Sequence, residues 1–179
     1  PLLAPQAYDK LVVNLATHMH AFADSPYGML FIRAGVMIQQ HPWFGLGFDG
    51  FRHACPDPAY FHGLPWLGVA EGPHGGAGGC NLHPHNYYLL MGTMGGVPAM
   101  GLFIALVACL LAPIWWGMAP ARDPQRLMLG ITAARVLWPG QATSSLLTQP
   151  TAGWMFMAIG WALAASPVAT HLQYMHGRD

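Results

Sequence analysis

The chain has 179 residues, of which 54% are hydrophobic and 8% are charged. Charged residues make up about a quarter of soluble globular domains, so the composition disfavours a soluble protein. Seven basic and seven acidic residues cancel, which excludes recruitment of nucleic acid by a strongly basic surface. The sequence begins at Pro1 without a methionine and shows no signal peptide, so we expect a fragment of a longer membrane protein.

Residues 1–40 predict an amphipathic helical segment. LAPQAYDKLVVNLATHMHAFA, residues 3–23, has apolar residues at helical spacing with polar residues between them. MLFIRAGVMIQQ, residues 29–40, has the same character, with Arg33 and the two glutamines as its polar part. We expect such helices to lie on a membrane surface or to cover a bundle of spanning helices.

Residues 41–85 predict a long loop outside the membrane. The segment is rich in glycine, proline and aromatic residues and has little periodicity, and loops of this length are usually functional or disordered. Its tryptophans and phenylalanines argue against disorder, so we expect an ordered loop. The run GPHGGAGG is interpreted either as a flexible hinge or as a cradle of backbone N–H groups for phosphate.

Residues 86–179 predict about three transmembrane helices with short loops, which makes the fold class all-α and membrane-embedded. No Lys, Arg, Asp or Glu occurs from Gly72 to Ala121, and the apolar core at residues 87–118 exceeds the ~20 residues that cross a bilayer. Further candidate spans cover residues 127–147, interrupted by Arg135, and residues 152–168.

The link APARDPQR, residues 119–126, sets the predicted orientation. It carries Arg122 and Arg126 between two candidate spans, and basic links favour the cytoplasmic side. His85 and the loop before it then lie on the opposite, external face of the membrane.

The predicted loop holds many possible metal ligands, but their spacing matches no zinc motif, so we expect no metal. The pool comprises His53, Cys55, Asp57, His62, Glu71, His74, Cys80, His83 and His85. Cys55 and Cys80 face an oxidising compartment in this topology, where paired cysteines tend to form a disulfide; two unpaired thiols are the alternative. Cys109, within the first span, is interpreted as a small apolar filler.

His85 is the strongest candidate for acid–base chemistry. A neutral histidine takes a proton from a hydroxyl at working pH, and at a membrane surface that hydroxyl belongs to a lipid-linked molecule. The alternative is a solvated loop residue, which is less favoured because an amide and a helix start follow directly. Asn86 either caps this helix or binds sugar hydroxyls. Pro84 restricts His83 to an extended conformation, which we expect to set the two histidines apart.

Two motifs in order carry a resemblance to a known family. The first motif is HPWFGLGF at residues 41–48. After a loop comes the second motif, in which His85 and Asn86 are followed by nine residues and then by Gly96. Together and in this order, the two motifs resemble the bacterial O-antigen ligase and O-antigen polymerase superfamily. The likeness covers about residues 27–165, which corresponds to the C-terminal half of such proteins. Ala99 stands where a second glycine is usual, and Tyr27 stands where the family places an arginine.

The resemblance implies a metal-independent, cofactor-free inverting glycosyltransferase that moves a glycan from an undecaprenyl-pyrophosphate carrier. The acceptor would be a hydroxyl of a saccharide, lipid-linked or not, at the periplasmic face. His85 matches the family's loop histidine and would be the base. Arg52, or alternatively Arg33, would bind the pyrophosphate, because the planar guanidinium binds phosphate oxygens bidentately. Gly45, Gly47 and Gly96 are expected to have structural roles.

A membrane transporter or a non-catalytic membrane scaffold with a periplasmic lid is the alternative function. Arg135 motivates it, because a charge inside a membrane span is a functional candidate by default and would suit a translocation path.

Overall fold

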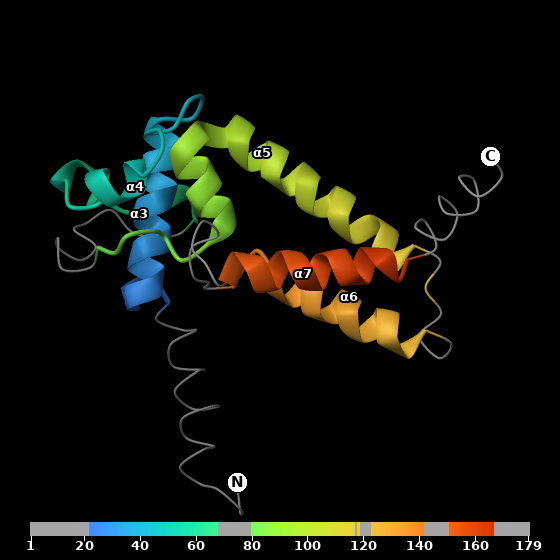
Figure 1. Ribbon diagram of the computed structural model, residues 1–179. Helices are drawn as coiled ribbons and strands as arrows, with labels where there is room; N and C mark the ends of the chain where they lie inside the picture. Colours follow the sequence, from blue (N-terminus) through green and yellow to red (C-terminus); the bar gives the residue numbers. More distant parts are fainter. Residues whose placement is uncertain (1–21, 68–79, 117, 119–122, 142–150, 167–179) are drawn as a thin grey trace, which may run out of the picture.

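The structure, a computed structural model, describes residues 22–67, 80–116, 118, 123–141 and 151–166. Within these ranges the chain is all-helical and contains no strand, which confirms the predicted fold class in its coarse form. Figure 1 shows α3 (Pro26–Gln40) and α4 (Gly50–Ala54) packed beside the first part of α5 (Tyr87–Trp115). Helices α6 (Pro124–Val136) and α7 (Thr151–Ala164) lie side by side next to its second part. Most of the predicted helix at residues 3–23 and the whole GPHGGAGG run lie outside the described residues.

Helix α3 (Pro26–Gln40) confirms the predicted helix at residues 29–40 and begins three residues earlier. The Ser25 hydroxyl accepts a hydrogen bond from the Gly28 amide, which satisfies one of the donors that a helix start leaves open. The two glutamines are exposed, but Arg33 is only 1% exposed and is not part of a polar face as predicted. Apolar side chains of α3 pack into a core with Phe51 and Leu64.

The predicted loop at residues 41–67 is largely folded. It contains α4 (Gly50–Ala54) and the short 3₁₀ helices η3 (Pro58–Tyr60) and η4 (Pro65–Leu67). Cys55, at the end of α4, forms a disulfide with Cys80, 25 residues further along, with 5.7 Å between the two Cα atoms. In the chain-entropy account, closing a loop of this size stabilises the fold by about 3 kcal/mol.

Helix α5 (Tyr87–Trp115) is broken, whereas the sequence predicts a continuous span. Gly95 and Gly96 have non-helical backbone angles, and Figure 1 shows the helix bent between its two parts. Among the described residues, α5 is the one helix that is long and apolar enough to cross a membrane. The part after the break, residues 97–115, is about 28 Å long, close to the ~30 Å thickness of a bilayer core.

Backbone groups of the HPWFGLG segment fill the break in α5. The Val97 amide donates to the Pro42 carbonyl at 2.7 Å, and the Thr93 carbonyl, its partner in an unbroken helix, accepts from the Leu46 amide at 2.7 Å. The Met94 carbonyl accepts from the Gly47 amide at 3.0 Å. In a continuous helix it would face Pro98, which has no N–H to donate. Each of these backbone groups therefore has a hydrogen-bond partner despite the break.

Two of the motif glycines are required by this close approach. Gly45 has φ of +61°, and a Cβ atom there would lie 2.6 Å from the Thr93 carbonyl oxygen. Gly96 has φ of +70° and ψ of −166°, a region that is essentially restricted to glycine, and its Cβ would overlap the Pro42 carbonyl. The expected structural roles of Gly45 and Gly96 thus have a geometric cause.

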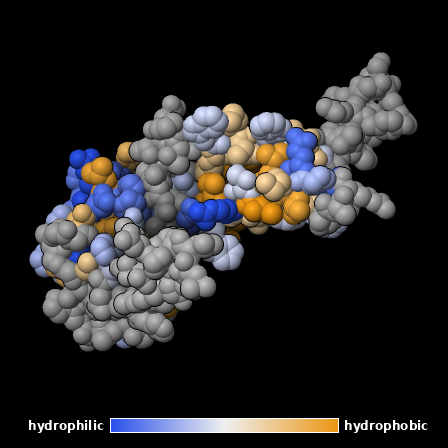
Figure 2. Space-filling model, turned by 90° about the horizontal axis from the view of Figure 1, so that it is seen from below, coloured by the Kyte–Doolittle hydropathy of each residue, from blue (hydrophilic) through white to orange (hydrophobic). Residues whose placement is uncertain are grey.

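Helices α6 (Pro124–Val136) and α7 (Thr151–Ala164) pack against α5 around a second core. This core contains Tyr87, Val107, Ile114, Ala133, Leu137, Met155, Ile159 and Ala162. Large apolar side chains also face outward, among them Leu102, Met128, Trp154 and Trp161, and Figure 2 shows hydrophobic residues gathered over this end of the molecule. With 13 and 14 residues, α6 and α7 are about 20 Å long, shorter than the predicted second and third spans.

The two ends of α6 are bonded to the two ends of α5. At one end the Arg126 Nε donates to the Ile114 carbonyl at 2.8 Å, which supplies a cation where helix carbonyls lack partners. At the other end the Tyr88 hydroxyl donates to the Leu137 carbonyl at 2.6 Å. A 13-residue helix therefore returns the chain to the start of α5, because the bend shortens the distance to be covered.

We predict that Gly96→Ala destabilises the protein by about 2 kcal/mol or more, because alanine is strained at this backbone conformation and its methyl group meets Pro42. Gly101→Ala is the matched control, since a Cβ at Gly101 enters open space on the same helix. Thermal unfolding of both variants in detergent measures the difference. An effect of Gly96→Ala no larger than that of Gly101→Ala would contradict the described break.

Candidate functional site

His85 lies in a short segment that is fixed at both ends. The disulfide holds Cys80, and Asn86 begins α5 as its N-cap. His85 itself has φ of +52°, a left-handed conformation that is uncommon outside glycine. Such strain costs on the order of 1–3 kcal/mol and gathers at functional sites, where the surrounding structure maintains it. The backbone therefore marks His85 independently of its side-chain chemistry.

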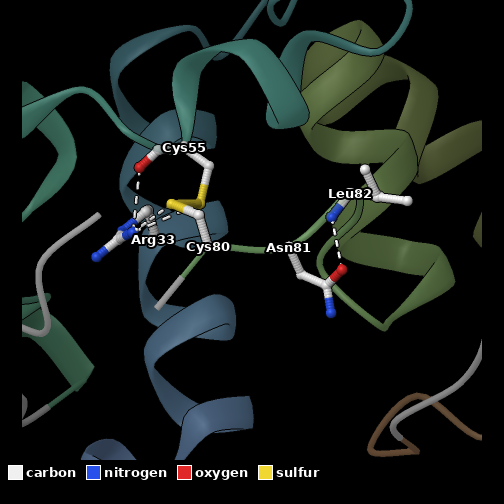
Figure 3. The surroundings of a disulfide bond; sticks show 5 residues. All are labelled: Arg33, Cys55, Cys80, Asn81 and Leu82. Carbon is white, nitrogen blue, oxygen red and sulfur yellow. Dashed lines mark hydrogen bonds between the residues drawn. A yellow bond between two sulfur atoms is a disulfide. The ribbon is translucent and has the colours of Figure 1, made fainter. Parts of the chain in front are cut away.

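Asn81 determines which nitrogen of His85 carries a proton. The Leu82 backbone amide donates to the Asn81 Oδ1 at 2.7 Å, and Figure 3 shows this contact. The other end of the amide, Nδ2, then faces the His85 Nε2 at 2.7 Å. Because Nδ2 can only donate, Nε2 accepts, and a neutral His85 carries its proton on Nδ1. Sequence reasoning missed Asn81; its one signal is an amide four residues before the histidine.

Two further rings surround the His85 imidazole. The His83 ring lies 4.4 Å away between centroids, so the prediction that Pro84 sets the two histidines apart is wrong. The left-handed backbone of His85 turns its ring back toward His83. On another side the Tyr27 ring meets His85 edge to face at 5.5 Å. Tyr27 is at the first turn of α3, so the structure joins two positions that are 58 residues apart in the sequence.

Asn86 acts as the helix cap. Its Oδ1 accepts hydrogen bonds from the Tyr88 and Leu89 amides at 3.0 and 3.1 Å. Its Nδ2 donates to the Pro139 carbonyl at 2.6 Å, which ties the start of α5 to the segment after α6. The side chain is buried and both ends of its amide are engaged within the protein. This geometry favours the capping interpretation over binding of sugar hydroxyls.

The Arg33 side chain lies against the Cys55–Cys80 disulfide. Its Nη1 donates to the Cys55 carbonyl at 3.1 Å and contacts the Cys80 sulfur at 2.7 Å, as Figure 3 shows. Its guanidinium carbon lies 4.1 Å from the centroid of the Phe61 ring, a cation–π distance. Burial lowers the pKa of Arg33 from its ordinary value. These contacts favour a structural role for Arg33 over contact with a pyrophosphate.

Arg52 is on the surface of α4. Its Nη1 lies 3.6 Å from the Asp49 carboxylate, which His53 also approaches to 3.7 Å. Exposed pairs of this kind contribute little to stability, so Arg52 can exchange Asp49 for an anionic ligand at small cost. Of the two arginines that the sequence offers for phosphate binding, Arg52 is the accessible one.

Metal-binding geometry is not found in the described part of the chain, where no three His, Cys, Asp or Glu side chains gather. Two members of the sequence pool, Glu71 and His74, lie outside the described residues.

An apolar groove of about 810 Å³ runs along α3 beside the start of α5. It extends from Phe22 and Phe31 near the start of α3 to Pro42 after its end, and Leu89 in the first turn of α5 also lines it. Leu89 is three residues from Asn86, so the groove passes close to the His85 segment.

Comparison of the chain with protein-family models, with curated proteins and with solved structures gives no match in any of the three.

We predict that the Asn81 carboxamide keeps the His85 proton on Nδ1. In Asn81→Asp the residue can only accept from the imidazole, so the proton should move to Nε2. Nitrogen-15 chemical shifts of the labelled His85 ring measure this directly, with Asn81→Ala expected to give a mixture of both tautomers. A wild-type ring that already carries its proton on Nε2 would contradict the described hydrogen bond.

Proposed function

We propose that this chain is part of an integral membrane glycosyltransferase of the O-antigen ligase or polymerase type. It moves a glycan from an undecaprenyl-pyrophosphate carrier onto an acceptor hydroxyl at the periplasmic face. The observation that carries the proposal is the mutual docking of the two resembling motifs. Pro42 and Gly47 of the first motif bond the backbone beside Gly96 of the second, although about 50 residues separate them in the sequence.

The position that corresponds to the family's arginine supports the same proposal. Tyr27 stands at that position, and its ring contacts His85. If the likeness of the motifs were accidental, this position would have no reason to lie against the candidate base. The tyrosine is 48% exposed, so this contact lies where a substrate can approach it.

His85 acts as the general base in the proposed reaction. Its Nε2 lone pair points toward the Asn81 amide, and the acceptor hydroxyl takes the place of that donor. The hydroxyl oxygen then bonds to the anomeric carbon of the transferred sugar while its proton passes to Nε2. The bond from the anomeric carbon to the pyrophosphate oxygen breaks, with inversion at the carbon. Arg52 stabilises the departing anion, because its guanidinium is accessible and can donate two parallel hydrogen bonds to phosphate oxygens.

The carrier lipid occupies the apolar groove along α3. A volume of about 810 Å³ with almost wholly apolar lining suits a stretch of a branched hydrocarbon chain. Leu89, which lines the groove, is three residues from Asn86, so the pyrophosphate at the head of the lipid would reach the reacting segment.

The second part of α5, α6 and α7 cross the bacterial inner membrane in this proposal, and residues 41–85 lie in the periplasm. The outward apolar surface of these helices supports it, as do exposed tryptophans at both ends of the bundle. Trp138 follows Leu137, whose carbonyl binds Tyr88 at one end of the bundle. Trp116 is at the opposite end, where its carbonyl binds Arg126.

The transporter alternative loses the observation that motivated it. Arg135 is in the last turn of α6, two residues before Leu137, whose carbonyl the start of α5 binds. It therefore lies at the end of the helix bundle and not in the middle of a span, where an arginine would indicate a translocation path.

We predict that His85→Ala lowers glycan transfer by about 10²–10⁴-fold, the usual effect of removing a general base. The assay follows a polyprenyl-pyrophosphate-linked glycan in vesicles with EDTA present, using the longest form of the protein that inserts. His83→Ala is the matched control, because it removes the neighbouring imidazole and should cost less than about tenfold. Near-normal turnover by a folded His85→Ala variant would contradict the mechanism. Absence of transfer by the wild type would refute the function.

A further inference from the structure

A polar cleft lies at the far end of α3 from His85. Its volume is about 550 Å³, and its lining consists of Gln39, Gln40, His62, Gly63, Pro65 and Trp66. No acidic side chain, lysine or arginine lines it among the described residues. A cleft with this lining offers hydrogen bonds without a charge to attract an ion.

Internal hydrogen bonds hold one wall of this cleft in a defined state. The His62 Nδ1 lies 3.3 Å from the Gly63 carbonyl, which can only accept, so Nδ1 carries the proton. The His62 Nε2 then accepts from the Gln40 Nε2 at 3.1 Å. The Gln40 Nε2 is also 3.4 Å from the Ala59 carbonyl, which fixes the amide with its oxygen as the remaining acceptor. Both ring nitrogens of His62 and the Gln40 amide nitrogen are therefore engaged within the protein, which fixes this wall of the cleft.

The remaining groups fit a sugar ring. The Gln39 side chain is exposed and offers both a donor and an acceptor, which is what a hydroxyl pair requires. Trp66 is 68% exposed beside it and presents a flat apolar surface with one N–H donor. A sugar has the matching combination of hydroxyl edges and a C–H face. A phosphate or a carboxylate would find no cation here.

We propose that this cleft binds an uncharged sugar unit. The binding itself is independent of the proposed function, but the source of the sugar, the glycan being transferred, rests on it. Gln39 follows Tyr27 by twelve residues along α3, so the cleft is about 18 Å from the ring that contacts His85. The cleft is therefore too far from His85 to hold the reacting sugar, and it holds a unit several sugars further along the glycan.

Such a remote site would give the protein a preference for long glycans. A glycan that is bound at both His85 and the cleft gains affinity from the second contact, whereas a single sugar can occupy only one of the two sites. Gln39 and Trp66 also line the apolar groove, so the cleft and the groove meet along α3.

The test is direct binding of the full chain, in nanodiscs, to an array of uncharged and acidic bacterial oligosaccharides. We expect binding to uncharged members, reduced about tenfold or more by Trp66→Ala and by His62→Ala. Trp43→Ala is the matched control, because Trp43 is 71% exposed and does not line the cleft, and it should leave binding unchanged.

Two results would overturn the proposal. One is no binding to any uncharged oligosaccharide, and the other is undiminished binding by both Trp66→Ala and His62→Ala. The array contains no lipid-linked donor, so its outcome is independent of transfer. Binding by a wild-type protein that transfers no glycan would refute the proposed function and leave the sugar site standing.

Discussion

The break in α5 is the constraint on which the rest of the structure depends. Bending an apolar helix frees an amide at Val97 and a carbonyl at Thr93, and Pro98 leaves the Met94 carbonyl without a helical donor. Buried groups of this kind cost about 1–3 kcal/mol each if they stay unsatisfied. The HPWFGLG segment supplies all three partners through its own backbone. Gly45 and Gly96 must lack a side chain for this contact to form.

The candidate site follows from that contact. The docked segment fixes the first part of α5 against α3, which places the Asn86 cap and the His85 segment beside Tyr27. The disulfide at Cys80 fixes the other end of the same short segment. A left-handed histidine is maintained because both ends are held, and Asn81 then sets its tautomer. The same bend brings the second part of α5 to α6 and α7.

The sequence predicts those features that depend on local patterns. The helix at residues 29–40 follows from periodicity, the helix start at Tyr87 from the beginning of the apolar run, and the Cys55–Cys80 pair from the inferred compartment. The break in α5 could not be predicted, because glycines and prolines also occur in continuous membrane helices and the partners come from about 50 residues away. Arg33 was misplaced because periodicity treats arginine as polar, whereas the disulfide and Phe61 provide a buried environment for it.

The central claim is that His85 and the link between α5 and α6 lie on opposite sides of a membrane. Reporter fusions after Arg122 and after Gln149 measure this most directly in cells. We expect a cytoplasmic signal after Arg122 and a periplasmic signal after Gln149, because α6 returns the chain to the His85 end of α5. The reverse pattern, or the same compartment at both positions, would contradict the topology and the transfer mechanism built on it.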